Sequence, residues 1–222
     1  MEAFTTHRGR VAVLDWTDVN TDLIIPARYL KRVERVGYGP LLFADKRYIP
    51  GGEPEADAPE THGPEAPDFP LNRPSARGAT VLVVRKNFGC GSSREHAVWA
   101  VAQAGFRAVI APVKGEGFAD IFEGNAYGNG LLPLELPEDQ WGAIAEAGRT
   151  DAGAEVTIDL RALTMTLHQA GGPGQTFAIE VPEAQRHRLL NGLDAIAETL
   201  LDEPAIRAHE VKAPAWITPR PA

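Results

Sequence analysis

Hydrophobic and polar residues alternate in two different ways along this chain. Continuous apolar runs at 80–84, 106–111 and 131–136 are typical of strands that are buried on both faces. The stretches 94–104 and 118–127 lie between these runs and have the spacing of helices. Strands that alternate with helices at this spacing predict parallel pairing through right-handed crossovers.

The pattern changes after about residue 150. Three segments, 155–160, 164–168 and 175–181, alternate apolar and polar residues, as half-exposed antiparallel strands do. Pro182 follows directly, and proline is favoured in the first turn of a helix. We therefore expect one long helix from Pro182 through Leu201.

The amino-terminal region combines a short apolar run with a polar turn. Residues 10–15 predict a strand, and it leads into the turn-forming and capping residues of 18–22. The apolar triplet 23–25 then stops at Pro26, which predicts a buried loop. With no internal repeat, the whole pattern predicts one compact α/β domain over residues 1–222.

The stretch 50–70 differs sharply in composition from the rest of the chain. It holds six prolines, three glycines and six acids, and it has no lysine or arginine. Such a segment excludes a helix or a central strand and predicts a long mobile surface loop. Two interpretations stay open: a solvated insertion, or a lid that orders when a substrate or partner binds.

Composition and charge exclude several classes of protein. Over 222 residues, 22 lysines and arginines face 30 acids, and a net charge of -8 gives no reason to bind nucleic acid or anionic membranes. The polar amino terminus lacks the pattern of a signal peptide, and no apolar run is long enough to span a membrane. Cys90 is the single cysteine, so a cysteine-ligated iron–sulfur site cannot be completed within this chain. That usage fits a reducing, cytoplasmic setting.

The densest cluster of chemically capable residues is 87–97, Asn-Phe-Gly-Cys-Gly-Ser-Ser-Arg-Glu-His-Ala. Its glycines allow a ligand to approach the backbone closely. Ser92 and Ser93 fall at the predicted helix start, where free N–H groups favour an anion. Arg94 adds a planar fork of donors that suits a carboxylate. The cluster therefore predicts a carboxylate-binding loop with a reactive serine.

Three known motifs do not fit this loop. A dinucleotide fingerprint needs glycine at position 94, a P-loop needs Gly-Lys-Ser/Thr, and a nucleophile elbow needs a glycine that is absent after the serines. Three alternative interpretations stay open on spacing alone. In the first, Ser92 and Ser93 only cap the helix. In the second, His96 activates Ser92 for hydrolysis, and in the third, Cys90 acts as a nucleophilic thiolate.

The loop resembles the Gly-Ser-Ser-Arg-Glu-His loop of the aconitase superfamily, in the form found in bacterial isopropylmalate dehydratase small subunits. Three more stretches resemble this family in the same order: 18–31, 118–122 with 129–133, and 191–194. The resemblance spans residue 1 to about residue 205.

The resemblance implies a three-layer β/β/α swivelling domain that closes over a large subunit. In this family the large subunit carries a 4Fe–4S cluster with one iron free of cysteine, and the iron acts as a Lewis acid on the leaving hydroxide. The pair interconverts 2-isopropylmalate and 3-isopropylmalate through 2-isopropylmaleate in leucine biosynthesis. The single cysteine of this chain agrees with a cluster held by the partner and with no metal ligand here.

The resemblance also implies roles for residues of the loop. Ser92 matches the base that removes the proton next to a substrate carboxylate. Arg94 matches a residue that holds a substrate carboxylate, with Ser93 as a second donor and Gly91 at the substrate. Asp22 matches an active-site aspartate, for which we expect an orienting role.

Two features of the sequence bear on the side chain of the substrate. Leu30 and Lys31 follow the segment that in this family helps to read the variable side chain. The chain has Val-Lys-Gly-Glu-Gly at 113–117, where the family places a single serine. Homoaconitate or a methyl-substituted malate is therefore an alternative substrate. A non-catalytic binding domain of the same fold is a further alternative, which the presence of Ser92 and Arg94 disfavours.

Overall fold

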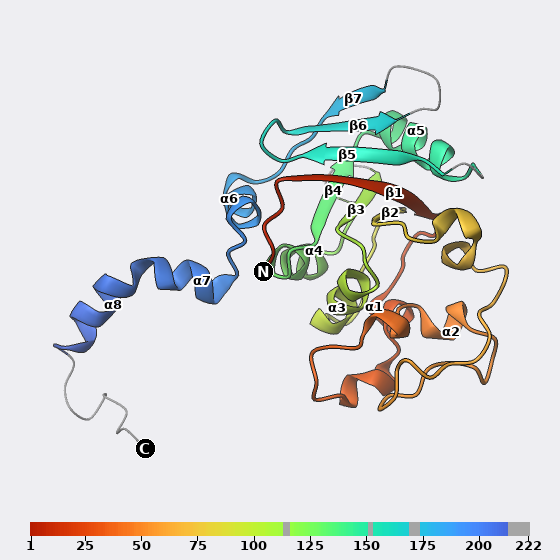
Figure 1. The fold of residues 1–222 in the computed structure, drawn as a ribbon, viewed down its shortest axis with the longest axis horizontal. Coiled ribbons are helices and arrows are strands. Elements are labelled where there is room, and N and C mark those ends of the chain that lie inside the picture. The colour runs from red at the N-terminus through yellow and green to blue at the C-terminus, as the bar shows by residue number, and fades with distance from the viewer. Residues whose placement is uncertain (113–115, 151–152, 169–173, 213–222) are drawn as a thin grey trace.

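The computed structural model describes residues 1–112, 116–150, 153–168 and 174–212. At its centre is one seven-stranded sheet in the order β4-β3-β2-β1-β5-β6-β7 (Figure 1). The strands are β1 (Thr6–Leu14), β2 (Val81–Val84), β3 (Ala108–Pro112), β4 (Leu132–Leu136), β5 (Glu155–Asp159), β6 (Thr164–His168) and β7 (Gln175–Ala178).

The direction of pairing changes along β1. Its second half pairs in parallel with β2, and Leu14 lies opposite Val84, the last residue of that strand. Its first half, Thr6 to Arg10, pairs antiparallel with β5. The expected parallel pairing of the central strands and antiparallel pairing of the later strands are both confirmed.

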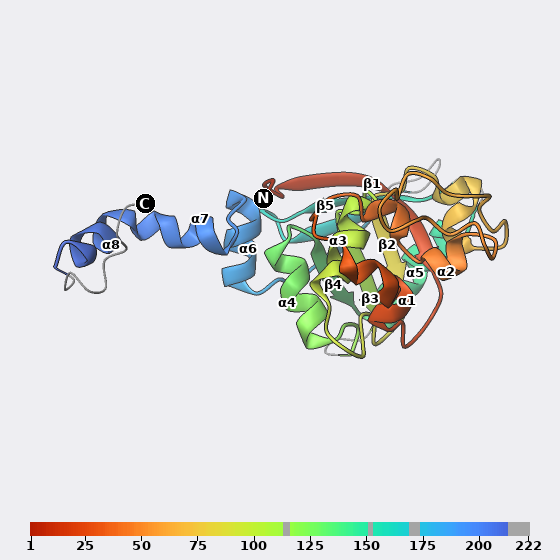
Figure 2. The ribbon, with the colours of Figure 1, turned by 90° about the horizontal axis from the view of Figure 1, so that it is seen from below.

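Helices cover the parallel half of the sheet on both faces. They are α3 (Glu95–Gln103) and α4 (Asp120–Gly128), which share one core, and α5 (Glu138–Gly148), which lies in the other. Leu14 and Leu82 of the sheet pack into the core of α3 and α4. The alternate residues Val11 and Val81 pack into the core of α5, together with the inner faces of β5, β6 and β7. Figures 1 and 2 show the resulting layers, and the predicted α/β fold of β/β/α type is confirmed.

Short helical turns fill the region between β1 and β2. They are α1 (Thr21–Ile24), η1 (Ala27–Lys31), η2 (Gly39–Leu41), α2 (Ala44–Arg47), η3 (Pro70–Asn72) and η4 (Pro74–Ala76). The predicted buried triplet is confirmed in part, because Ile24 and Ile25 are fully buried while Leu23 is half-buried.

The prediction of one long carboxy-terminal helix is wrong. Helix α6 (Glu183–Asn191) does begin after Pro182, but it ends at Gly192, whose φ of 66° is left-handed. Asp194 then caps a new helix, α7 (Ala195–Thr199), and is followed by η5 (Leu200–Asp202) and α8 (Glu203–Glu210). Glycine after a helix and aspartate before one are ordinary stop and start signals.

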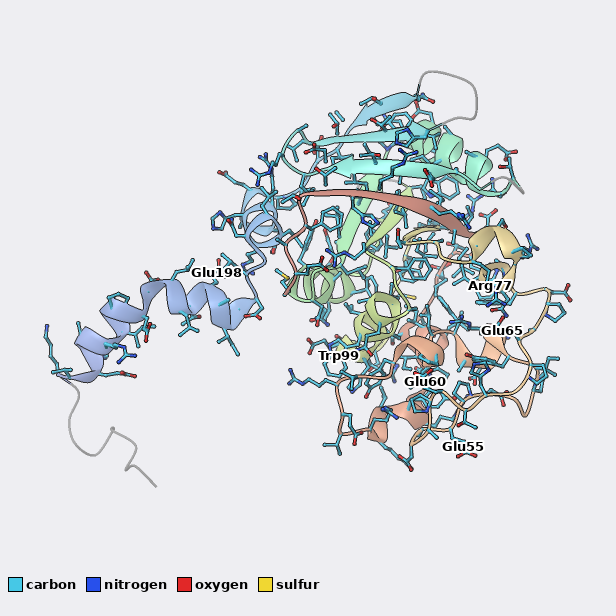
Figure 3. The ribbon with its side chains drawn as sticks, in the orientation of Figure 1. Glu55, Glu60, Glu65, Arg77, Trp99 and Glu198 are labelled. Atoms are coloured by element: carbon cyan, nitrogen blue, oxygen red, sulfur yellow. The ribbon has the colours of Figure 1, made fainter. Side chains whose placement is uncertain are left out.

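Residues 193–212 form a carboxy-terminal arm that projects from the body of the molecule (Figures 1 and 2). No residue of α7, η5 or α8 is buried. The arm is tied at its root by the Arg188–Glu198 ion pair, at 2.5 Å, which involves the Glu198 labelled in Figure 3. None of the described helices has the length and hydropathy that a membrane crossing requires.

The proline-rich stretch 50–70 contains no α-helix and no strand, as expected. It is nevertheless attached to its surroundings at several points. The Tyr29 hydroxyl donates to the Pro54 carbonyl at 2.8 Å, and the Glu65 carboxylate pairs with Arg47 and with Arg77, which lies beside it in Figure 3. The mobility of this stretch stays a prediction.

Candidate active site

The candidate site lies where the parallel strands β1 and β2 end. Because Leu14 and Val84 are partners, the loops that follow them leave the sheet side by side. Phe88 pairs with Phe118 in an isolated bridge, which brings the start of α4 to the same edge. Open α/β sheets bind their ligands outside the carboxyl ends of the strands.

Hydrogen bonds join the two loops over their whole length. Gly89 N donates to the Val19 carbonyl at 2.8 Å, and Asn87 Nδ2 donates to Asp18 Oδ1 at 2.6 Å. Asp18 and Asn87 both have left-handed backbones, with φ of 55° and 61°. Asx residues tolerate this conformation better than others, and the bonds between the loops hold it.

Two glycines with left-handed backbones shape the loop around Cys90. Gly89 has φ of 80° and Gly91 has φ of 87°. A Cβ added to Gly89 would lie 2.4 Å from Cγ of Phe122, so the ring of Phe122 occupies the space of any side chain. Glycine at position 89 is therefore required both by conformation and by packing.

The serines do not cap the helix. Arg94 is the residue that precedes α3, and it makes no capping hydrogen bond, so the alternative in which Ser92 and Ser93 cap the helix is wrong. Both serines are exposed, and neither side chain has a partner among the described residues. The N–H groups of Gly91, Ser92 and Ser93 likewise find no acceptor in the described part of the chain. Unpaired donors grouped in this way suit an anion.

The Arg94 side chain is held on one side only. Its Nη1 lies 2.9 Å from Asp22 Oδ2 and 2.9 Å from Thr21 Oγ1. Within the described residues, Nε and Nη2 have no partner, and the side chain is 17% exposed. This leaves the Nε–Nη2 edge of the guanidinium available to a planar carboxylate. The structure thus brings Asp22 and Arg94 together, while their roles in catalysis stay predictions.

Thr21 is the site residue that sequence reasoning missed. Its side chain is buried, with 1% exposure, and its hydroxyl donates to the Ser92 carbonyl at 2.6 Å. In the sequence it stands inside a cluster of turn-forming residues, so nothing in its spacing marks it as different from them.

Leu30 and Lys31 make no polar contact with the serine loop, residues 87–94. They lie at the end of η1, where Leu30 is half-buried against the core and Lys31 is exposed. Neither side chain forms a hydrogen bond or ion pair with residues 87–94. Their role in reading the substrate stays a prediction.

The geometry excludes a serine–histidine pair. The His96 ring packs against the rings of Tyr38 and Trp99, with centroids 5.6 Å and 4.7 Å away, and it makes no hydrogen bond with Ser92. Trp99 is labelled on α3 in Figure 3. Burial lowers the pKa of His96, which further weakens it as a proton acceptor.

The Cys90 thiol is also unsuited to nucleophilic chemistry. Burial and the nearby Asp18 carboxylate raise its pKa, so the reactive thiolate form is disfavoured. No group of three His, Cys, Asp or Glu side chains in the described part of the chain is arranged to hold a metal ion. Since Cys90 is the single cysteine, the residues of this chain do not fit an iron–sulfur cluster.

The insertion at 113–117 lies largely outside the described residues, because these begin again at Glu116. Glu116 and Gly117 accept hydrogen bonds from the backbone N–H groups of Asn87 and Phe88, at 2.8 Å and 2.9 Å. The described end of the insertion, Glu116 and Gly117, therefore adjoins residues 87–88, while the effect of the insertion on substrate preference stays a prediction.

Comparisons with known proteins show the family of this chain. Residues 1–139 match the model of the aconitase C-terminal domain. The 3-isopropylmalate dehydratase small subunit of Teredinibacter turnerae is 48% identical over 96% of this chain and 94% of its own. That of Marinobacter nauticus is 46% identical over 95% and 93%. A crystal structure of 3-isopropylmalate dehydratase from Methanocaldococcus jannaschii is 27% identical, covers 92% of this chain and 98% of its own, and has a TM-score of 0.58. The chain therefore belongs to the aconitase C-terminal domain family and, within it, to the 3-isopropylmalate dehydratase small subunits.

Proposed function

We propose that this chain is the small subunit of a heteromeric hydro-lyase that interconverts 2-isopropylmalate and 3-isopropylmalate in leucine biosynthesis. The observation that carries the proposal is the open edge of Arg94 beside Ser92 and the unpaired N–H groups of its loop. The names of full-length relatives favour isopropylmalate over homoaconitate or a methyl-substituted malate.

The loop would bind a substrate carboxylate at two places. Nε and Nη2 of Arg94 present parallel donors to its two oxygens, an arrangement that a point charge does not reproduce. The Ser93 hydroxyl and the Gly91 N–H are additional donors on the same exposed loop. The aliphatic end of the substrate would extend toward Leu30 and Lys31.

Ser92 would remove the proton next to that carboxylate. A serine hydroxyl is a poor base unless the alkoxide that it becomes is stabilised. The charge of Arg94 and the unpaired N–H groups of the loop supply donors fixed in advance of the reaction, which is the arrangement that stabilises a developing anion best. Asp22 orients the guanidinium through their 2.9 Å contact.

The hydroxide that leaves in the dehydration needs a Lewis acid, and this chain has no ligand set for one among its described residues. We therefore assign a 4Fe–4S cluster to the large subunit. The swivelling domain of residues 1–222 would close its serine loop over that subunit in the cytoplasm. The single cysteine is in keeping with such a reducing compartment.

The proposal is tested with the assembled two-subunit enzyme. Initial rates with 3-isopropylmalate, homoaconitate and a methyl-substituted malate are compared at equal enzyme concentration. We expect the highest kcat/KM with 3-isopropylmalate and no turnover by the small subunit alone. Turnover of none of these acids by a cluster-containing complex, or a clear preference for homoaconitate, would contradict the proposal.

A further inference from the structure

Thr21 contacts the serine loop at three alternate residues. Its backbone N–H donates to the Cys90 carbonyl at 2.9 Å. Its hydroxyl donates to the Ser92 carbonyl at 2.6 Å and accepts from Arg94 Nη1 at 2.9 Å. One buried side chain thus holds both the main chain of the proposed base and the guanidinium of the proposed carboxylate ligand.

The first consequence concerns which edge of Arg94 meets the substrate. A guanidinium Nη carries two hydrogens, and the two oxygens near Nη1 belong to Thr21 and Asp22. With Nη1 occupied in this way, the Nε–Nη2 edge is the one that remains for a ligand. Asp22 alone would not fix the plane of the guanidinium, because its carboxylate is 55% exposed and can rotate.

The second consequence concerns Ser92. Gly89 and Gly91 give the backbone before Ser92 more conformational freedom than other residues would. The Ser92 side chain makes no hydrogen bond of its own among the described residues, so its position depends on its main chain. The bond from Thr21 to the Ser92 carbonyl is the interaction that fixes this main chain from the neighbouring loop.

We propose that Thr21 is a positioning residue that aligns Ser92 and Arg94 with each other for catalysis. The inference rests on the proposed function, because it concerns how the proposed base, Ser92, and the carboxylate-binding edge of Arg94 are held at a fixed distance from each other. It adds a hydroxyl that never touches the substrate but determines where two groups that do touch it are held.

The test uses the assembled enzyme with four variants of this chain, measured beside Ser92→Ala and Arg94→Lys. Thr21→Val keeps the shape of the side chain and removes the hydroxyl, and Thr21→Ala removes it without risk of a steric clash. Thr21→Ser restores the hydroxyl. The matched control is Thr150→Val, because the Thr150 hydroxyl also donates to a backbone carbonyl, that of Ala147 at 2.8 Å, outside the site.

We expect Thr21→Val and Thr21→Ala to lower kcat/KM by about 10- to 100-fold, the range for a hydrogen bond to a charged group. Both kcat and KM should change. KM should rise because Arg94 is no longer held in place, and kcat should fall because Ser92 is no longer aligned. The inhibition constant of malonate, a dicarboxylate that the enzyme cannot dehydrate, should rise with KM. Thr21→Ser should recover most of the loss, and Thr150→Val should match the unchanged enzyme.

Three results would overturn the inference. One is a kcat/KM within twofold of the unchanged enzyme for a folded Thr21→Val or Thr21→Ala complex. Another is a Thr21→Ser complex as impaired as Thr21→Val, which would show that the methyl packing matters and the hydroxyl does not. The third is normal activity of Ser92→Ala and Arg94→Lys, which would remove the roles proposed for the base and the carboxylate ligand as well. Impaired Ser92 and Arg94 variants beside a normal Thr21→Val would remove the inference alone.

Discussion

The serine loop, 87–94, makes more contacts with its surroundings than the carboxy-terminal arm, 193–212, although the arm has more regular secondary structure. The loop contains no helix or strand, yet it is connected to the neighbouring loop by hydrogen bonds that Asp18 and Val19 accept and Thr21 donates. The arm is mostly helical, yet none of its helical residues is buried. Four of its apolar side chains are largely exposed: Ile196, Leu200, Leu201 and Val211.

The positions of these segments therefore depend on their contacts with the rest of the molecule and not on regular secondary structure. A helix satisfies its own N–H and C=O groups, so it can persist while it packs against little else. An irregular loop cannot do this, and its polar groups must find partners elsewhere. In the serine loop, the groups that find no partner are those that the proposed function uses, which are the Gly91–Ser93 N–H groups and one edge of Arg94.

The largest effect is expected where the loop meets the substrate. Ser92→Ala should lower kcat of the assembled enzyme by about 100- to 10,000-fold, because it removes the proton acceptor. The free energy of unfolding should change by less than about 0.5 kcal/mol, since the exposed hydroxyl makes no hydrogen bond within the described residues. Steady-state kinetics and thermal melts of Ser92→Ala beside Ser75→Ala measure both. Equal kcat for the two variants would show that Ser92 is not the base.

The next effect concerns the open edge of Arg94. Arg94→Lys keeps the charge but loses the parallel pair of donors, so kcat/KM should fall by about 10- to 100-fold while the melting temperature stays nearly the same. Arg73→Lys is the control, because Arg73 is exposed and has no side-chain partner among the described residues. Indistinguishable kinetics for lysine and arginine at position 94 would show that its parallel donors do not bind the substrate carboxylate.

A third substitution tests the rigidity of the loop itself. Gly51→Ala and Gly89→Ala both place alanine at a left-handed φ, 85° and 80°, which costs about 1–2 kcal/mol. Gly51 has nothing within 4 Å of the added Cβ, whereas Gly89 has the Phe122 ring at 2.4 Å. Gly89→Ala should therefore lose about 1–3 kcal/mol more than Gly51→Ala in denaturant titrations. Equal losses would mean that the loop can move away from Phe122.

The smallest effect is expected in the arm. Leu200→Ser and Leu201→Ser should leave the free energy of unfolding of the isolated chain within about 0.5 kcal/mol, since both side chains are exposed. Leu189→Ser, which changes a fully buried side chain of α6, should lose about 2–5 kcal/mol. A loss for the arm variants close to that of Leu189→Ser would show that the arm packs against the body.

The sequence predicted the framework well because buried strands have a simple pattern. The continuous apolar residues of β2 and β3 and the alternation in β5 and β6 each correspond to one kind of burial. The break at Gly192 was missed because apolar residues continue beyond it, although the glycine and Asp194 were its local signals.

The sequence indicated residues of the candidate site but not the contacts between them. Arg94 was indicated by its planar donors and Asp22 by a family resemblance, and the structure places the two in contact. Helix α3 begins after Arg94, so Ser92 and Ser93 do not cap it. The spacing of residues in the sequence does not locate a helix start to within one or two residues. Thr21 acts through a partner more than seventy residues away, and no local pattern records such a contact.

The most direct test of this account is anaerobic reconstitution of the isolated chain with iron and sulfide, followed by an assay with 3-isopropylmalate. We assign carboxylate binding and proton transfer to this chain and the metal to its partner, because Cys90 alone cannot ligate a cluster. We therefore expect no bound cluster by iron analysis and no turnover, with activity appearing when a cluster-containing large subunit is added. Stoichiometric cluster uptake together with turnover by the isolated chain would contradict it.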